Sequence, residues 1–439
     1  MNAIHQIYCT HCTYGSSALE QREGELAERV LGYSARAGSL EHNELRGYYR
    51  QLERFLYYYL PSDSPPEERL KLDAATAPRR MFYSPCIGRL RVLGQVAYRR
   101  HDTVGRAGSY FAHVLFGERG EAPWPVLDCL RLWGAPWVIE DAPGHPKRLP
   151  TLGALRGGGL RGVSGGGLRC FPAGAPMSAR PEAIDDGVLL SFLKTPRGQA
   201  FDDPQRVVPE RWRAVSPDER AALLIDVAQA YIKLGSDRRA SVLLVCEPSL
   251  AALVFYGVAR LLPCAVRSGV SFSTYEPSAD RLPVALAATT FYAPDTTDLK
   301  VEAYRRRGYV YNTYLNRRSD LGRPCGHYAR LLIETLLSQG WPAVDALLDG
   351  FAAARCGKVE ELEILVQRRR LAPRLLDPAA GLAWRPRSTP GTAIAAPRPI
   401  VRPPTPPTRI VPAPPRQNPP LAVAAAAPLR QPPPSPDYS

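Results

Sequence analysis

The sequence contains no long hydrophobic run. No segment reaches the roughly 18 successive uncharged apolar residues that a membrane-spanning helix needs. The first residues, MNAIHQIYCTHC, also lack the basic region and the following apolar core that mark a secretory signal. We therefore expect a cytoplasmic protein that does not associate with membranes.

A disulfide framework is also missing. The nine cysteines are odd in number and irregularly spaced, which favours reduced, mostly buried thiols. Cys9 and Cys12 have the spacing of a zinc or redox pair, but a structural zinc site needs four ligands, usually from two such pairs. The most similar second pair, Cys325 and His327, lies far along the chain. We interpret Cys9 and Cys12 as ordinary thiols, with a metal or redox role as the alternative, and expect no cofactor.

The common local motifs of enzymes do not occur. The sequence has no Walker A, HExxH, GxSxG or kinase motif. The glycine triplets of RGGGLRGVSGGGLR, at 156–169, are not followed by lysine and a serine or threonine, as a phosphate-binding loop would require. We interpret them as part of a flexible linker.

A strong basic signature for nucleic acid is lacking as well. The net charge is +14, but residues 371–439 hold eight arginines against two aspartates and so contribute +6 of it. The remaining +8 is modest for the length, and no basic helix or RNA-binding motif accompanies it. Nucleic acid is therefore an unlikely partner.

The first region, 1–150, combines strand and helix patterns. Seven apolar residues at helical spacing predict a helix over 43–60, which Pro61 ends. Strands are expected at 4–8, 30–36, 80–83, 90–98 and 110–116. This region is expected to be an N-terminal α+β domain, followed by a glycine-rich linker over 151–184.

The second region, 185–320, carries a pattern similar to a βαβ unit. Ser216, Pro217 and Glu219 form a capping box that starts a helix. Strands at 241–245 and 270–275 flank a helix over 248–262, for which Ser249 is a possible cap, and no dinucleotide fingerprint accompanies them. Ser271, Ser273 and Thr274 could bind a ligand, but we favour hydrogen bonds to the backbone.

The end of the chain has a different composition. Helices are expected over 321–370, broken near 340–342. Residues 371–439 are rich in proline and arginine, which predicts disorder with polyproline II character. We interpret this tail as a spacer, with docking of other proteins as the alternative. The predicted fold class is α+β: two fused mixed α/β domains, a short helical segment and a disordered tail.

The stretch YRRHDTVGRAGSYFAHVLF, at 98–116, holds the candidates for chemistry. His113 and Asp102 could supply a base and its orienting carboxylate. Arg106 could bind an anion, and Ser109 could be a nucleophile only beside a histidine. The candidate binding residues are Arg106, Gly105, Gly108 and Tyr110.

A structural interpretation of the same stretch is favoured. Asp102 and Thr103 can bond nearby backbone groups, and Gly105 and Gly108 can adopt a positive φ. SYFAHVLF would then be a strand that enters the core, with His113 facing away from its neighbours Ala112 and Val114.

The same stretch resembles the signature of the bacterial GTPase-associated protein family, in its N-terminal domain of the second type. The family core is DxxGRxGxYxxH, whose positions are here Asp102, Gly105, Arg106, Gly108, Tyr110 and His113. IHQIYCT and LRGYYRQLERFLYYYLP are similar to other segments of that domain, and ARLLP at 259–263 and SFSTY at 271–275 to its middle domain. CTHC and EQREGELAE replace the family's usual glycine-rich loop.

The resemblance implies an adaptor or regulator that binds partner proteins in a bacterial GTPase-based conflict or signalling system. The expected partner is a GTPase encoded nearby, and the tail could bind other proteins. Proteins of this family are not established enzymes, so no catalytic residue is implied. The alternative function is a hydrolase that uses His113 and Asp102, with Arg106 binding an anion. Weak nucleic-acid binding is a third hypothesis.

Overall fold

The computed structural model contains one mixed α/β unit over the residues that it describes. Residues 1–383 form a compact unit, and the described residues all lie within it. They are 4–12, 17–19, 32–60, 71–72, 76–101, 107–118, 124–135, 137–139, 148–149, 151–152, 184–202, 207–234, 240–277, 284–290, 308–319, 327–354, 356 and 358–371. The predicted tail, apart from Leu371, and most of the predicted linker lie outside these ranges.

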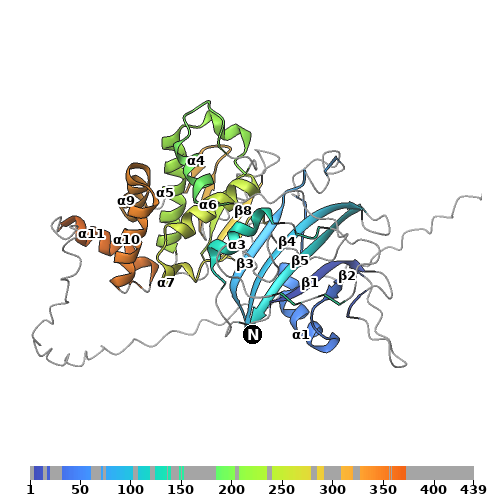
Figure 1. Cartoon of the computed structure of the whole chain (residues 1–439). Helices are drawn as coiled ribbons and strands as arrows, with labels where there is room; N and C mark the ends of the chain where they lie inside the picture. The colour runs from blue at the N-terminus through green and yellow to red at the C-terminus, as the bar shows by residue number, and fades with distance from the viewer. Residues whose placement is uncertain are drawn as a thin grey trace, which may run out of the picture. The chain divides into compact units, whose positions relative to one another are not determined.

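The sheet has ten strands in the order β10-β9-β6-β8-β7-β3-β4-β5-β1-β2. Its antiparallel part pairs β3 with β4, β4 with β5, β5 with β1 and β1 with β2 (Figure 1). The bounds are β1 His5–Cys12, β2 Gly32–Gly38, β3 Arg80–Ile87, β4 Leu90–His101 and β5 Ala107–Glu118. All five strands were predicted, and each of them extends beyond its predicted carboxyl end.

The other part of the sheet is mainly parallel. β6 pairs in parallel with β8 and β9, β8 pairs in parallel with β7, and β10 is antiparallel to β9. The bounds are β6 Val242–Val245, β7 Phe272–Ser273, β8 Leu286–Thr289, β9 Tyr309–Asn312 and β10 Arg317–Arg318. The predicted βαβ pattern is present, but β8 lies between β6 and β7.

An antiparallel pairing of β3 with β7 joins the two parts into one sheet. Phe82 lies opposite Ser273 and Tyr83 opposite Phe272. Residues of the predicted first and second domains therefore share a continuous hydrogen-bonded sheet. The α+β fold class is confirmed, and the boundaries between domains remain a prediction.

The helices cover opposite faces of the sheet. Alternation along the strands directs Val92 and Val114 toward the core that contains α1, and Leu93 and Leu115 toward the core that contains α3 to α6. The bounds are α1 His42–Leu52, η1 Glu53–Phe55, α3 Val126–Arg131, η2 Leu132–Gly134, α4 Asp186–Lys194, η3 Glu210–Ala214, α5 Pro217–Leu234, α6 Pro248–Arg260, α7 Cys264–Arg267, α9 His327–Gln339, α10 Trp341–Ala353 and α11 Val359–Leu371.

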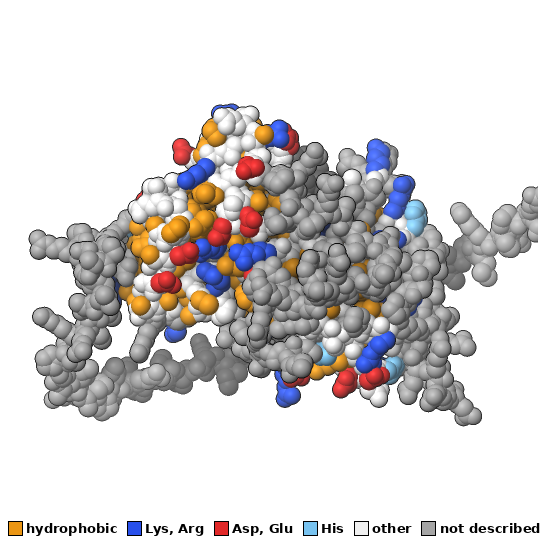
Figure 2. All heavy atoms as spheres, viewed as in Figure 1, with side chains coloured by type: hydrophobic (Ala, Val, Ile, Leu, Met, Phe, Trp, Pro, Cys, Tyr) orange, Lys and Arg blue, Asp and Glu red, His pale blue; other side chains and the backbone are white. Residues whose placement is uncertain are grey.

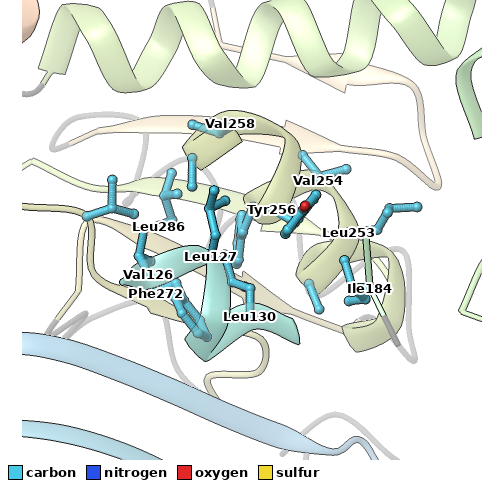
Figure 3. Close-up of a cluster of buried hydrophobic side chains, with 14 of the residues drawn as sticks. Val126, Leu127, Leu130, Ile184, Leu253, Val254, Tyr256, Val258, Phe272 and Leu286 are labelled. Atoms are coloured by element: carbon cyan, nitrogen blue, oxygen red, sulfur yellow. The ribbon is translucent and has the colours of Figure 1, made fainter. Parts of the chain in front are cut away.

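The core between α3, α6 and the sheet is apolar. Figure 3 shows Val126, Leu127 and Leu130 of α3 directed toward side chains of α6 and of the strands β7 and β8. Leu253, Val254 and Val258 of α6 are buried. This contact links helices that come from the predicted first and second domains. None of the described helices is long and apolar enough to cross a membrane.

The helix predicted over 43–60 ends earlier than its apolar pattern suggests. After Leu52 there is one 3-10 turn, and residues 57–60 are neither helix nor strand. The carbonyls of Phe55 and Tyr57 accept hydrogen bonds from Arg80, and the Tyr59 carbonyl accepts one from the Tyr275 hydroxyl. These carbonyls bind tertiary donors, so they are not available to helical amides four residues later.

Two local predictions in the second region have different outcomes. The capping box is confirmed, because Ser216 Oγ accepts from the Glu219 amide at 3.3 Å and Glu219 Oε2 accepts from the Ser216 amide at 2.9 Å. The suggestion that Ser249 caps α6 is wrong, since the N-cap residue is Glu247 and Pro248 occupies the first turn.

Candidate functional site

The family motif lies on the hairpin formed by β4 and β5. Tyr98 pairs with Tyr110, and His101 pairs with Ala107 at the last described position before the connection. Asp102, Gly105 and Arg106 lie in this connection, outside the described residues. Gly108 has a φ of +78°, a conformation that side chains with a Cβ rarely adopt, so its prediction as a positive-φ glycine is confirmed.

His113 is enclosed in the sheet's buried face. Its side chain has no solvent exposure and packs edge-on against the rings of Tyr8 and Trp137, at centroid distances of 4.7 and 5.1 Å. The Val138 amide donates to Nδ1 at 3.4 Å, so Nε2 carries the proton and donates to Oε1 of Gln6 at 3.0 Å. Both ring nitrogens are thus engaged.

The environment of His113 disfavours proton transfer. Burial lowers the pKa of its imidazole to about 3, because the charged form would lose its hydration. Ser109 lies four residues earlier on the same strand, which is roughly 13 Å away at 3.3–3.4 Å per residue. His113 and Ser109 therefore do not form a nucleophile and base pair.

Five tyrosines lie near the end of the motif hairpin at which β4 connects to β5. We call them the tyrosine patch: Tyr33, Tyr49, Tyr59, Tyr98 and Tyr110. The rings of Tyr33 and Tyr110 stack at 4.1 Å with an interplanar angle of 2°. The Tyr49 hydroxyl donates to the Tyr33 carbonyl at 3.1 Å. Burial raises the pKa of Tyr110, and the nearby hydroxyls of Tyr33, Tyr49 and Tyr59 raise it further. β2, α1, the segment at 57–60 and the motif hairpin all contribute to this patch.

The tyrosine patch is accessible and has charged neighbours. Tyr33 is 41% and Tyr59 66% exposed, which places both among the few exposed large hydrophobic residues of the described chain. Arg100 lies close enough to Tyr98, and Glu53 close enough to Tyr49, to influence the pKa of these tyrosines. Stacked, partly exposed tyrosines with both charge signs nearby suit recognition of another molecule.

Cys9 and Cys12 are buried thiols on β1. Burial raises the pKa of Cys9, and the neighbouring Cys12 raises it further. The Cys12 thiol donates weakly to the carbonyls of Thr10 and Ser34 at 3.7 and 3.8 Å. In the described part of the chain, no three His, Cys, Asp or Glu side chains are arranged to hold a metal ion. A high pKa and burial suit unreactive thiols.

The hydroxyls of the SFSTY segment bind backbone groups, as predicted. Ser271 Oγ accepts from the Ala285 amide, and Ser273 Oγ donates to the Tyr275 carbonyl. Thr274 Oγ1 accepts from the Met81 amide at 2.8 Å and donates to the Arg79 carbonyl at 3.1 Å. This segment attaches β7 to β3.

A buried ion pair beside this junction was missed by the sequence analysis. Arg80 and Glu276 are fully buried, with 2.9 Å between Nη2 and Oε1, and the Tyr57 hydroxyl donates to Glu276 Oε2 at 2.7 Å. The guanidinium also lies over the Tyr57 ring, at 4.6 Å from its centroid. The two residues lie 196 positions apart in the sequence, so no local spacing pattern predicts that they are partners.

The ARLLP segment, at 259–263, also connects elements that are far apart in the sequence, through Arg260. Arg260 Nε donates to Asp186 at 3.1 Å, Nη1 lies 2.6 Å from Asp345, and the guanidinium lies over the Trp341 ring. These contacts join α4, α6 and α10. On the face shown in Figure 2, basic and acidic side chains gather among hydrophobic ones over the helical part of the described chain.

Comparison with protein families matches residues 3–155 to the family described as GTPase-associated protein 1, N-terminal domain type 2. The match covers β1 to η2, including the motif hairpin. The match to residues 3–155 supports the GTPase-associated protein family that the resemblance predicted. The middle domain stays a prediction. A comparison with curated proteins gives no match.

Proposed function

We propose that this protein is a non-catalytic adaptor or regulator that binds a GTPase encoded nearby, within a bacterial conflict or signalling system, and that the tyrosine patch is its contact surface. The observation that carries this proposal is the position of the patch. Exposed Tyr33 and Tyr59 lie beside Tyr98 and Tyr110, at the end of the hairpin that carries the family motif. The family match supports the class of partner.

Tyrosines are effective contact residues for physical reasons. Each offers a large apolar ring, a polar hydroxyl and few rotatable bonds, so that little conformational entropy is lost on binding. Tyrosines are accordingly enriched among the residues that dominate binding energies. Tyr33 is already held by its stack on Tyr110 and by the bond from Tyr33 Oη to Ser109 Oγ, which further reduces this loss.

The two other hypotheses receive less support. A hydrolase that uses His113 and Asp102, with Arg106 as the anion-binding group, would need a base that can accept a proton near neutral pH, whereas burial lowers the pKa of His113 to about 3. Nucleic-acid binding would give steeply salt-dependent retention on DNA. Flat retention between low and physiological salt would contradict it.

A pull-down with the neighbouring GTPase tests the proposal. The full chain should retain the GTPase when it is loaded with GDP or with a GTP analogue, and replacement of Tyr33 and Tyr59 by serine should weaken binding about tenfold or more, a typical loss for central interface tyrosines. Tyr314→Ser is the matched control, because Tyr314 is 40% exposed but follows β9.

Each failure has a separate meaning. No retention in either nucleotide state would overturn the adaptor proposal. Retention that is equal in the double variant and in the wild type would remove the tyrosine patch as the contact surface.

A further inference from the structure

Gln95 is a buried polar residue in the face of the sheet that packs against α3 and η2. It lies on β4, opposite Met81 of β3 and His113 of β5, with 2% of its surface exposed. Neither Nε2 nor Oε1 of its amide has a hydrogen-bond partner among the described residues. Leaving both atoms of a buried amide unbonded is costly, so folded proteins supply such groups with a protein partner or with ordered water. Gln95 therefore points to a ligand inside the core.

The indole of Trp133, in η2, is a second buried group of this kind. Trp133 is 2% exposed, and its Nε1 has no acceptor within the described part of the chain. Arg79, the residue before β3, donates from Nη1 to the Trp133 carbonyl at 3.2 Å, and its guanidinium carbon lies 5.0 Å from the centroid of the Trp133 ring. Because Arg79 lies two positions before Met81, which pairs with Gln95, these contacts hold Trp133 near the strand pair that carries Gln95.

The chain that follows Trp133 reaches the strand on the other side of Gln95. The ring of Trp137 packs against that of His113 at a centroid distance of 5.1 Å, and the Val138 amide donates to His113 Nδ1 at 3.4 Å. β4 lies between β3 and β5, and Gln95 is directly opposite His113. Trp133 and Trp137 are thus held at the two strands that flank Gln95, and the amide and the Trp133 indole lie in the same buried layer.

The hydrogen-bonding capacity of these groups matches that of water. The Trp133 indole can only donate, whereas the Gln95 amide donates from Nε2 and accepts at Oε1. A water molecule both accepts and donates, and buried waters typically make about three hydrogen bonds to groups that are otherwise unsatisfied. A metal cation does not suit the set, because two of its three atoms are donors. Ala97, which follows Gln95 on the same face of β4, adds only a methyl group to this layer.

We propose that ordered water binds between Gln95 and Trp133, inside the core of the first region. It accepts from Trp133 Nε1, donates to Gln95 Oε1 and satisfies Gln95 Nε2 directly or through a second water molecule. The water connects η2 to β4 next to His113, the buried histidine of the family motif. This inference does not depend on the proposed function, because it concerns the buried face of the sheet and involves no residue of the tyrosine patch.

Proton NMR of the full chain with isotopically labelled tryptophan tests the proposal directly. The indole signal of Trp133 is the one that is lost in Trp133→Phe. In the wild type, its Nε1 proton should show cross-relaxation with water of opposite sign in laboratory-frame and rotating-frame experiments, which marks a bound water, whereas proton exchange gives equal signs. Gln95→Met should abolish this cross-relaxation and keep the Trp133 signal itself. Absence of the cross-relaxation in the wild type would overturn the proposal.

The stability of two variants tests the same site. Gln95→Met keeps the length of the side chain and removes both polar atoms of the amide, and it should raise the ratio of unfolded to folded protein about fivefold. Trp133→Phe should raise this ratio further, because it also removes ring volume. Since both residues bind the same water, the double variant should raise the ratio about fivefold less than the product of the two single effects.

Trp212→Phe is the matched control. The Trp212 Nε1 is also buried and has no acceptor among the residues that the structure describes, but its ring packs against Phe192 of α4. Its effect should multiply with that of Gln95→Met. Simple multiplication for Gln95 and Trp133 as well would overturn a shared water. A Gln95→Met variant that is more stable than the wild type would also overturn the proposal, because only removal of an amide without water would stabilise the fold. Should a variant fail to fold, the wild-type cross-relaxation decides alone.

Discussion

At the scale of single residues, His113 has the role of a neutral hydrogen-bonding group in a packed core. Its two ring nitrogens bond Gln6 and Val138, and its ring contacts Tyr8 and Trp137. These contacts come from β1 and from the segment after η2, and all of them favour the uncharged imidazole. His113 is therefore a residue whose protonation opposes folding.

We expect His113 to make the protein acid-sensitive. Its pKa is about 3 in the fold but about 6.5 in an unfolded chain, so below pH 6.5 only the unfolded state gains the proton. The free energy of unfolding should fall by up to roughly 1.4 kcal/mol per pH unit between pH 6.5 and 3 from this group alone. Urea denaturation at pH 7, 5.5 and 4.5 measures it, with His113→Asn as the variant that lacks this contribution.

The wild type and the His113→Asn variant should differ in how steeply the free energy of unfolding depends on pH, as well as in its value. Between pH 6.5 and 4.5, the free energy of unfolding of the wild type should fall by about 2–3 kcal/mol more than that of the variant. Parallel pH dependences would contradict this account of His113. Should the variant not fold, the ring protons of His113 in the wild type give the same answer, because their chemical shifts should not titrate between pH 7 and 5.

At the scale of elements, hydrophobic periodicity and end signals predicted most of the helices and strands. The capping box at Ser216, the break at Gly340 between α9 and α10, and the strands of the motif hairpin all follow from local chemistry. The helix after Asn43 shows the limit of this reasoning. Its apolar pattern continues to Leu60, but Arg80 and Tyr275 bind the carbonyls that would have continued it.

Two glycines inside helices should respond oppositely to alanine. A Cβ on Gly257 of α6 would lie 2.8 Å from Leu224 Cδ1 of α5, whereas nothing lies within 4 Å of one on Gly47 of α1. Gly257→Ala should destabilise by about 1–3 kcal/mol, because Leu224 is fully buried and must be displaced. Gly47→Ala should stabilise by roughly 0.5–1 kcal/mol through helix propensity. Thermal denaturation of both variants measures the pair, and changes of the same sign would refute the packing argument.

At the scale of the whole molecule, the junction of β3 with β7 determines the architecture. It turns two runs of strands that are far apart in sequence into one sheet, and the buried pair of Arg80 and Glu276 lies beside it. Desolvation of two charges is costly, and their attraction offsets it only while both are present. We therefore expect the stability of this junction to depend on both members of the pair.

Removing one partner of this pair should cost more than removing both. Glu276→Gln leaves the Arg80 charge buried without a carboxylate and should destabilise by about 3–5 kcal/mol. The double variant Arg80→Met, Glu276→Leu should be more stable than either single variant, by about 2 kcal/mol. Equilibrium unfolding of the wild type, Arg80→Met, Glu276→Leu and the double variant closes the cycle. Additive effects would show that the two side chains contribute independently.

The sequence by itself determined most of the local elements, the capping box at Ser216, the positive φ of Gly108 and the family match of residues 3–155, since each depends on neighbours within a few positions or on a contiguous motif. Only the tertiary structure decided which strands pair across the two regions, what surrounds His113 and that Tyr33, Tyr59 and Tyr110 meet in one patch. The physical reason is that periodicity specifies a backbone conformation and a buried face, whereas contacts such as that of Arg80 with Glu276 depend on the packing of segments far apart in the chain.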